Sequence, residues 1–438
     1  MVRAWLALYA ALVTAPVLLA WWGEPSGGRV LGDSSSALAM SAYVMILAEF
    51  VLSGRFRFLS DAAGIDRVMR FHQLAGRVAA GILFFHPFLY AAERLGAGAG
   101  AALGRLHRLF AAPAYFSGVL AWVLLLLLVL VAIGRDRLRV PYEAWRLGHG
   151  LSALAVGILG LHHVLTVGAY SQAPLLAAFW FALTGIAVLA FASVYIARPL
   201  RLLRSPWRVV SIRCVAERQW EMTLENRSPR GFRFRAGQFV WLTIGMPLVV
   251  NDHPFSVVTP PAELPKVSLL IKETGDFTKS LSTIALDARA YVDGPYGAFT
   301  LDARNEAEIV FIAGGVGIAP ILSLLREAEA GHDRRPMRLV YGNRSARQIA
   351  YRDDIDVLAQ RLRMRVDYVL SEPPAESLPH VRGQLDGATL AAVLGSKPSP
   401  RALYLLCGPP PMMEEAETFL IRAGVPRRAI VSERFRYD

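Results

Sequence analysis

Cysteine is nearly absent from this sequence, which contains only Cys214 and Cys407. Two cysteines so far apart form no CxxC pair, and they provide no framework of disulfide bonds. Acidic residues are also scarce, because 35 aspartates and glutamates stand against 47 lysines and arginines, which gives a net charge of +12. This excess does not require a nucleic-acid partner, since basic loops beside a membrane and anionic cofactors explain most of it.

Charged residues make up only 19% of the chain and hydrophobic residues 54%, a composition too apolar for a soluble protein. Six apolar segments in the first half read as membrane spans. They cover residues 4–22, 37–52, 71–92, 113–133, 147–168 and 174–197. The first segment could instead be a cleaved signal peptide, with Arg3 as its basic n-region, but VLLAWWGEP offers no small-x-small cleavage site.

Histidines recur at one spacing in the third and fifth of these segments. His72 and His86 differ by 14 positions, and so do His149 and His163. Fourteen steps of ~100° return to within ~40° of the starting direction, so both imidazoles on a helix project from one face. A rise of ~1.5 Å per residue places them ~21 Å apart along the axis. Two such helices side by side would present two facing pairs of imidazoles, which fits two stacked bis-histidine haems.

The alternative is that these histidines are ordinary core residues. Ionisable side chains at membrane depth are rare and tend to be functional, which favours haem ligation. Arg77 lies within the third segment and also needs a partner there. A haem propionate is one candidate, and snorkelling or an ion pair with Glu49 is the alternative.

Arginines set the expected orientation of the spans. The loops at 53–70 and 134–146 and the segment 198–208 are rich in arginine, whereas the opposite loops carry few. Both termini are therefore expected in the cytoplasm, with the third and fifth spans running outward.

This orientation divides the histidines into an inner pair, His72 and His149, and an outer pair, His86 and His163. His162 is the alternative to His163. An ideal helix points His162 ~140° away from His149, and a π-bulge would reverse that choice.

The composition changes after Arg204. Residues 207–300 read as short alternating strands separated by glycine and proline, which predicts a small antiparallel barrel. From Glu308, buried strand-like runs alternate with helical patterns, as in a parallel α/β dinucleotide-binding fold. We therefore expect three domains, with boundaries at 1–204, 205–303 and 304–438.

Two motifs of the last domain point to a nucleotide site. GGVGIAP is not the GxGxxG fingerprint, but it stands between a strand and a helix, where glycines let a diphosphate approach free N–H groups. CGP follows another buried strand, and ligands bind beyond the carboxyl ends of such strands. A plain tight turn is the alternative for the first motif. The candidate residues are Gly314, Gly315, Gly317 and Pro320, with Cys407, Gly408 and Pro409.

Over nearly its whole length, the chain resembles the membrane ferric reductase and NADPH oxidase superfamily, of prokaryotic type, and its second half resembles ferredoxin–NADP⁺ reductases. HPFS at 253–256 is similar to the HPF[ST] flavin motif, and IKETGDFT at 271–278 is similar to the flavin diphosphate segment. GGVGIAP, CGP and ERF at 433–435 are similar to the nicotinamide-side motifs.

The resemblance implies a six-helix di-haem bundle, a β-barrel domain that binds FAD and a Rossmann-like domain that binds NADPH or NADH. At the flavin it implies roles for the HPFS motif, in which Phe255 packs on the ring and Ser256 hydrogen-bonds near its edge. Lys272 would bring charge to the diphosphate and Thr278 a hydroxyl donor. The flavin-site residues are His253, Pro254, Phe255, Ser256, Lys272, Gly275 and Thr278.

On the nicotinamide side, the resemblance implies that Phe435 covers the second face of the flavin, so that Phe435 and Ser256 are the expected catalytic residues. Core packing is the alternative for Phe435. Arg344 follows a strand end and could bind the 2′-phosphate of NADPH, and a surface arginine is the alternative.

Two departures from the family bear on the electron acceptor. Superoxide-producing members usually carry another histidine one turn beyond the outer ligand, where this chain has Tyr90. They also place an arginine toward the outer end of the second span, and residues 37–52 contain none. Both departures argue against efficient superoxide production.

The expected function is electron transfer from cytoplasmic NADPH through FAD and both haems to an external acceptor. That acceptor is oxygen, which would give superoxide, or a ferric complex. Alternatively, the chain is the electron-donating subunit of a periplasmic partner protein. The Arg- and Ala-rich composition suits a bacterial inner membrane.

Overall fold

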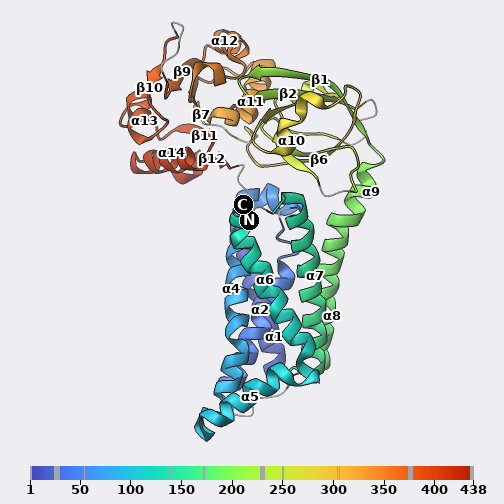
Figure 1. The fold of residues 1–438 in the computed structure, drawn as a ribbon. Coiled ribbons are helices and arrows are strands. Elements are labelled where there is room, and N and C mark those ends of the chain that lie inside the picture. Colours follow the sequence, from blue (N-terminus) through green and yellow to red (C-terminus); the bar gives the residue numbers. More distant parts are fainter. Residues whose placement is uncertain are drawn as a thin grey trace. The chain divides into compact units, whose positions relative to one another are not determined.

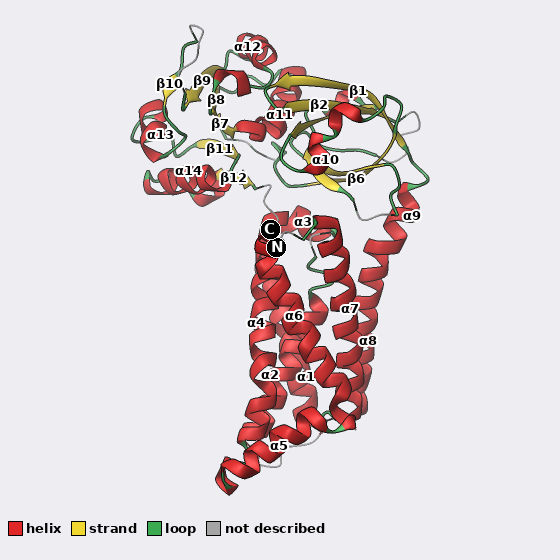
Figure 2. Cartoon of the chain, viewed as in Figure 1, coloured by secondary structure: helices red, strands yellow, loops and turns green. Residues whose placement is uncertain are grey.

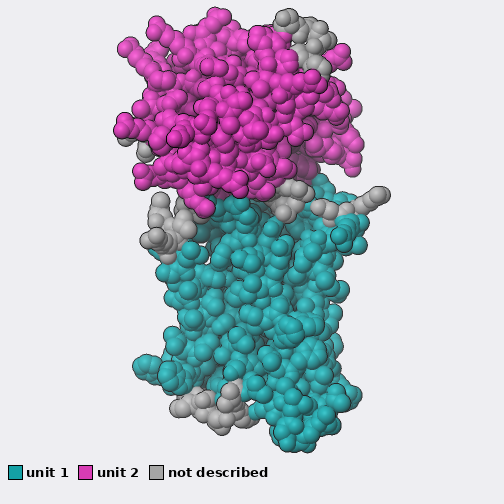
Figure 3. All heavy atoms as spheres, turned by 90° about the vertical axis from the view of Figure 1, so that its left-hand side faces the viewer, with its two compact units in different colours: residues 1–63, 67–199 teal, residues 64–66, 200–438 magenta. Residues whose placement is uncertain are grey.

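The computed structural model describes residues 2–23, 30–53, 55–138, 140–170, 173–226, 232–248, 251–302, 304, 306–372 and 378–434. The chain divides into two compact units, which are coloured separately in Figure 3. One unit consists of Met1–Ala63 with Arg67–Pro199, and the other of Gly64–Asp66 with Leu200–Asp438. Helices build the first unit, and every strand in the described ranges belongs to the second (Figure 2).

Among the described residues, six helices of the first unit are long and apolar enough to cross a membrane, which confirms the predicted number (Figure 1). The connecting helices are α3 (Arg57–Ala63) and α5 (Ala99–Ala111). The spanning helices are α1 (Val2–Gly23), α2 (Val30–Ala48), α4 (Ile65–Ala92), α6 (Phe116–Leu138), α7 (Tyr142–Thr166) and α8 (Pro174–Ala192). Helix α4 begins before the predicted apolar segment, because its first two turns carry arginines that a hydropathy reading excludes.

Small residues let the spanning helices approach one another closely. The Tyr43 hydroxyl of α2 donates a hydrogen bond of 2.7 Å to the carbonyl of Gly157 in α7. A Cβ added at Gly160 would come within 2.6 Å of the Tyr43 ring. Tyr43 packs in a buried apolar cluster with Leu47 and with Trp180 of α8. After α8, a π-helical stretch (Ser193–Ala197) leads into α9 (Arg198–Leu202).

The second unit begins with a six-stranded antiparallel sheet in the order β4-β3-β6-β1-β2-β5. One isolated bridge, between Val257 just after β4 and Leu269 of β5, connects the two ends of this sheet. The antiparallel sheet was predicted, and a closed barrel stays a prediction. The strands are β1 (Trp207–Ala216), β2 (Gln219–Glu225), β3 (Phe239–Ile244), β4 (His253–Ser256), β5 (Lys266–Lys272) and β6 (Arg289–Tyr296).

A parallel sheet follows, in the order β10-β9-β8-β7-β11-β12, as expected for an α/β fold. The strands are β7 (Glu308–Gly314), β8 (Met337–Asn343), β9 (Arg365–Leu370), β10 (Val381–Arg382), β11 (Ala402–Cys407) and β12 (Ile430–Glu433). The helices are α11 (Ile318–Ala330), α12 (Arg352–Arg361), α13 (Gly387–Leu394) and α14 (Pro410–Arg422).

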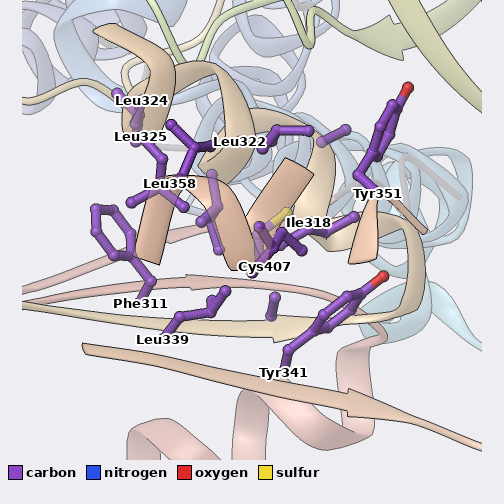
Figure 4. Packing of buried hydrophobic residues seen from close by; sticks show 14 of the residues in the cluster. Phe311, Ile318, Leu322, Leu324, Leu325, Leu339, Tyr341, Tyr351, Leu358 and Cys407 are labelled. Atoms are coloured by element: carbon purple, nitrogen blue, oxygen red, sulfur yellow. The ribbon is translucent and has the colours of Figure 1, made fainter. Parts of the chain in front are cut away.

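Apolar side chains cover both faces of this sheet, which is typical of parallel strands. Phe311 belongs to one buried cluster and its neighbour Ile312 to the other, because successive side chains on a strand point to opposite faces. Figure 4 shows Phe311 and Leu339 of the sheet beside Leu322, which belongs to α11. The two cores hold the strand ends, and therefore the motifs that follow them, in fixed positions.

Candidate functional site

The inner histidine pair meets across the first unit. The ring centres of His72 in α4 and His149 in α7 are 6.2 Å apart, with an angle of 59° between the rings. Two imidazoles that bind one metal from opposite sides have centres roughly 6 Å apart, given metal–nitrogen bonds of about 2 Å and about 1 Å within each ring. The pair therefore has the separation that a shared metal requires.

A carboxylate accompanies this pair. Oε2 of Glu49, just after α2, is in direct contact with Nδ1 of His72. In metal sites the second ring nitrogen of a histidine is commonly held by a carboxylate, which leaves Nε2 for the metal. The residues present thus fit a haem ligand set.

The outer pair lines a cavity of about 200 Å³. This volume is more than ten times the roughly 10–15 Å³ that one water molecule needs. His86 and His163 both line it, together with Tyr43, Tyr90 and Trp122. An apolar and aromatic cavity with two imidazoles fits a large planar cofactor better than it fits a channel for ions.

Two further residues shape the outer pair. Oγ of Ser35 lies 2.9 Å from Nδ1 of His86 and also donates to the His86 carbonyl at 3.1 Å. A Cβ at Gly118 in α6 would overlap the His163 ring, so only glycine leaves room for it. Among the residues that the structure describes, no group of three or more His, Cys, Asp or Glu forms a metal site. Paired histidines are therefore the donor sets available in this unit.

His162 occupies a different environment from His163. Its Nδ1 lies 2.9 Å from Oγ of Ser117, and its side chain is exposed. Residues Tyr142–Thr166 form one continuous α-helix, so no π-bulge shifts the register. The geometry brings His163 to the cavity, as ideal helix geometry predicted.

Arg77 points away from the histidines. It lies nine positions before His86, and nine steps turn ~180° around a helix. Its side chain is exposed, and it makes no hydrogen bond or ion pair with any residue in the described ranges. The suggested ion pair with Glu49 is therefore wrong, and the contact of Arg77 with a haem propionate stays a prediction.

Tyr90 and Arg105 form a contact that sequence reasoning missed. The Tyr90 ring centre is 6.2 Å from that of His86, and the Arg105 guanidinium carbon lies 4.5 Å from the Tyr90 ring centre. Arg105 belongs to α5, so an arginine stands near the outer pair although the second span has none. Only the packing of α5 against α4 brings these residues together.

The fold unites the two flavin motifs. Phe277, in the short helix α10 (Asp276–Lys279), stacks on His253 of β4 with ring centres 4.5 Å apart. The ring centres of Phe255 and Phe277 are 6.2 Å apart, with an angle of 27° between the ring planes. Lys272 is exposed at the end of β5, and Ser256 is buried. Residues 253–256 and 271–278 therefore border one site.

The Thr278 hydroxyl already has partners in this loop. It donates to the carbonyl of Gly275 at 2.9 Å and accepts from the amides of Thr274 and Gly275. Its expected role as a donor to the flavin diphosphate would require an exchange of that bond. In the structure its contribution is to fix the turn that holds Gly275.

The two nucleotide motifs lie side by side, as the sequence predicted from the carboxyl ends of parallel strands. Ala313 of β7 pairs with Cys407 of β11. A Cβ at Gly317 would overlap the Cys407 carbonyl, and one at Gly314 would meet Pro409 at 2.9 Å. These glycines thus permit the close approach of the two loops. Arg344 follows β8 at the same edge, where its Nε bonds Glu372 at 2.7 Å and its side chain is 74% exposed.

Glu433, the last residue of β12, is a buried carboxyl that pairs in the sheet with Cys407. Burial raises its pKa well above the usual range, and the same burial, with Glu433 nearby, raises the pKa of the Cys407 thiol. Sequence reasoning treated Glu433 only as part of the ERF motif. Phe435, the expected flavin cover, lies outside the described residues.

The raised pKa predicts a pH-dependent effect of Glu433→Gln. The folded protein keeps a proton that the unfolded chain gives up above its ordinary pKa of 4.5, so wild-type stability falls as pH rises from there toward the folded pKa. Glutamine needs no proton, and the variant should gain about 1.4 kcal/mol per pH unit over that interval relative to wild type. Thermal unfolding at pH 5 and pH 8 measures this, and an equal difference in Tm at both values would contradict it.

Three family descriptions match consecutive parts of the chain. "Ferric reductase like transmembrane component" matches residues 38–160, "FAD-binding domain" residues 207–300 and "Oxidoreductase NAD-binding domain" residues 311–418. The chain has the architecture of the NADPH oxidase and ferric reductase superfamily. It therefore combines a ferric-reductase-like membrane component with the FAD-binding and NAD-binding domains of an oxidoreductase.

Known relatives share parts of this chain. The reductase component of propane 2-monooxygenase from Mycolicibacterium goodii is 32% identical over 219 residues, which are 49% of this chain and 62% of that protein. Ferredoxin–NADP reductase B from Sorangium cellulosum is 27% identical over 235 residues, 52% of this chain and 96% of that protein. The flavohemoglobin of Malassezia yamatoensis covers 92% of this chain and 98% of its own, with a TM-score of 0.52 and 17% identity, which indicates a likeness of fold alone.

Proposed function

We propose that this member of the superfamily carries electrons across a membrane, from NADPH or NADH through FAD and two b-type haems to an acceptor on the opposite side. The main support is the arrangement of four histidines on α4 and α7, one pair 6.2 Å apart and the other lining one cavity. Each domain would bind one kind of cofactor. Residues 1–204 would bind the haems, residues 205–303 FAD and residues 304–438 the nicotinamide cofactor.

Haem, when bound, supplies one-electron redox chemistry. His72 and His149 would hold the inner group, and His86 and His163 the outer one. In the second unit, the amides around Gly315 and Gly317 and the start of α11 would bind a diphosphate. Buried Cys407 and the neighbouring Glu433 border the place where nicotinamide meets flavin.

The arginine-rich loops favour cytoplasmic termini in a bacterial inner membrane, with the dehydrogenase in the cytoplasm. The acceptor would then lie outside, as oxygen or a ferric complex. A protein acceptor is the second candidate. Two relatives are named as reductase components of propane 2-monooxygenase, and a third as the electron transfer component of xylene/toluene monooxygenase.

Turnover resolved by acceptor tests the proposal. The purified holoprotein receives NADPH in air, with ferric citrate under argon, or under argon alone, with superoxide dismutase as a control for superoxide. Rapid turnover with ferric citrate and slow turnover in air is the expected pattern, given Tyr90 in place of a histidine. Fast superoxide formation would favour the oxidase, and an inactive but fully reducible protein would favour a protein acceptor.

His163→Ala and His162→Ala should differ sharply in haem content. The first removes a ligand of the outer pair and is expected to lose half of the haem. The second removes only the bond to Ser117 and should keep both haems. Pyridine haemochrome assays of the two variants measure this, and the reverse pattern would assign the outer ligand to His162.

Arg344→Gln should weaken NADPH more than NADH. The guanidinium beside the nucleotide edge would contact the 2′-phosphate, and a hydrogen bond to a charged group contributes about 1.5–3 kcal/mol. We expect kcat/KM for NADPH to fall roughly tenfold or more while that for NADH stays within about twofold. If kcat/KM fell equally for NADPH and NADH, Arg344 would be only a surface residue that pairs with Glu372.

A further inference from the structure

Helix α2 and the residue that follows it supply a polar partner to one histidine of each pair. Ser35 contacts His86, and Glu49 contacts His72. Ser35 and Glu49 are 14 positions apart, the same interval that separates the paired histidines on α4 and on α7. The three elements therefore repeat one arrangement at two depths of the first unit.

The two arrangements differ in charge. The outer histidine has a hydroxyl as its partner, and the inner one has a carboxylate. The Glu49 side chain is only 11% exposed, and neither of its oxygens makes a well-oriented hydrogen bond to a described residue, so His72 is its principal polar contact. A buried carboxylate at the end of a candidate membrane span is costly to keep, which points to a functional reason.

We propose that Glu49 is a positioning residue that sets the direction of electron flow, by lowering the reduction potential of the inner haem relative to the outer one. A negative charge beside one ligand stabilises the oxidised centre, which carries one more positive charge than the reduced centre. The neutral Ser35 gives the outer centre no such bias. This inference rests on the proposed haem function.

The step concerned moves one electron from the inner centre to the outer centre, with no bond made or broken. The inner centre is oxidised and the outer centre is reduced. A lower inner potential makes this step downhill, so electrons that arrive from flavin are drawn outward.

A redox titration of the full-length holoprotein, followed by visible absorbance, tests this. In Glu49→Gln, one of the two one-electron midpoint potentials should rise by at least about 59 mV, while the other stays in place. A rise of about 59 mV corresponds to a tenfold change in the equilibrium constant for reduction. Asp33→Asn is the matched control, because it removes a carboxylate from the opposite end of α2. It should leave the lower potential unchanged.

Other outcomes are equally decisive. Two unchanged potentials, or equal shifts of both, in a Glu49→Gln protein with two haems would overturn the role of Glu49. If Glu49→Gln loses one haem, Glu49→Asp decides: retention of that haem in the aspartate variant supports the positioning role, and its loss there refutes it. A wild-type protein without haem would instead refute the proposed function itself.

Discussion

His86→Ala is expected to halve the haem content and to abolish acceptor reduction while NADPH still reduces the flavin. The two histidine pairs are separate, so the inner pair keeps both of its ligands. Loss of residues that merely support a metal ligand costs about 10- to 100-fold, so loss of a ligand should lower acceptor turnover by at least about 100-fold. Flavin reduction should persist, because the second unit, which carries the FAD and nucleotide domains, has buried cores of its own.

Tyr90→Phe is the control for this experiment. Tyr90 lies one turn beyond His86 and lines the same cavity, but it is not an expected ligand. The Tyr90→Phe variant should retain two haem equivalents in the pyridine haemochrome assay. Two full equivalents in His86→Ala would show that the outer pair is misassigned.

Gly317→Ala should sharply reduce nicotinamide binding without loss of flavin or haem. The new Cβ would overlap the Cys407 carbonyl and approach the Gly408 amide to 2.8 Å. Both are backbone atoms at the end of β11 and cannot move without distorting the sheet. Overpacking costs about 1–3 kcal/mol, which corresponds to a roughly 5- to 150-fold weaker affinity for NADP⁺.

Gly387→Ala provides the matched control in the same domain. Its nearest neighbour would be Cβ of Phe419 at 3.8 Å, an ordinary contact, and the residue opens helix α13. This variant should bind NADP⁺ like wild type in calorimetric titration. If Gly317→Ala also bound normally, the close approach of the two motifs would have no role in the nucleotide site.

Features governed by local geometry were accessible from the sequence. The 14-residue interval defines the direction of a side chain on any helix, so the pairing of His72 with His149 needed only two neighbouring helices. The outward direction of Arg77 follows from the same rule, through its nine-residue interval to His86. In the parallel sheet, GGVGIAP and CGP both follow the carboxyl ends of strands, and these ends lie at the same edge of the sheet. The two motifs therefore meet there whatever the sequence of the loops.

Contacts between distant helices were not accessible. Glu49 beside His72, Ser35 beside His86 and Arg105 over Tyr90 depend on the rotation of each helix about its axis, which packing decides. The hydroxyl of Thr278 is another such case. Whether it donates its hydrogen bond to a loop carbonyl or to a cofactor depends on the turn around Gly275. Sequence motifs identify the chemistry of a residue but not its partner.

The central claim, that electrons cross the membrane unit, is tested most directly in proteoliposomes. Protein oriented with its dehydrogenase outward receives NADPH outside, and ferric citrate is trapped inside. The account predicts that NADPH oxidation and appearance of internal ferrous iron proceed together, in a ratio of one NADPH to two electrons, and that both stop in His86→Ala. Reduction of external ferric citrate alone, with the internal pool unchanged, would contradict it.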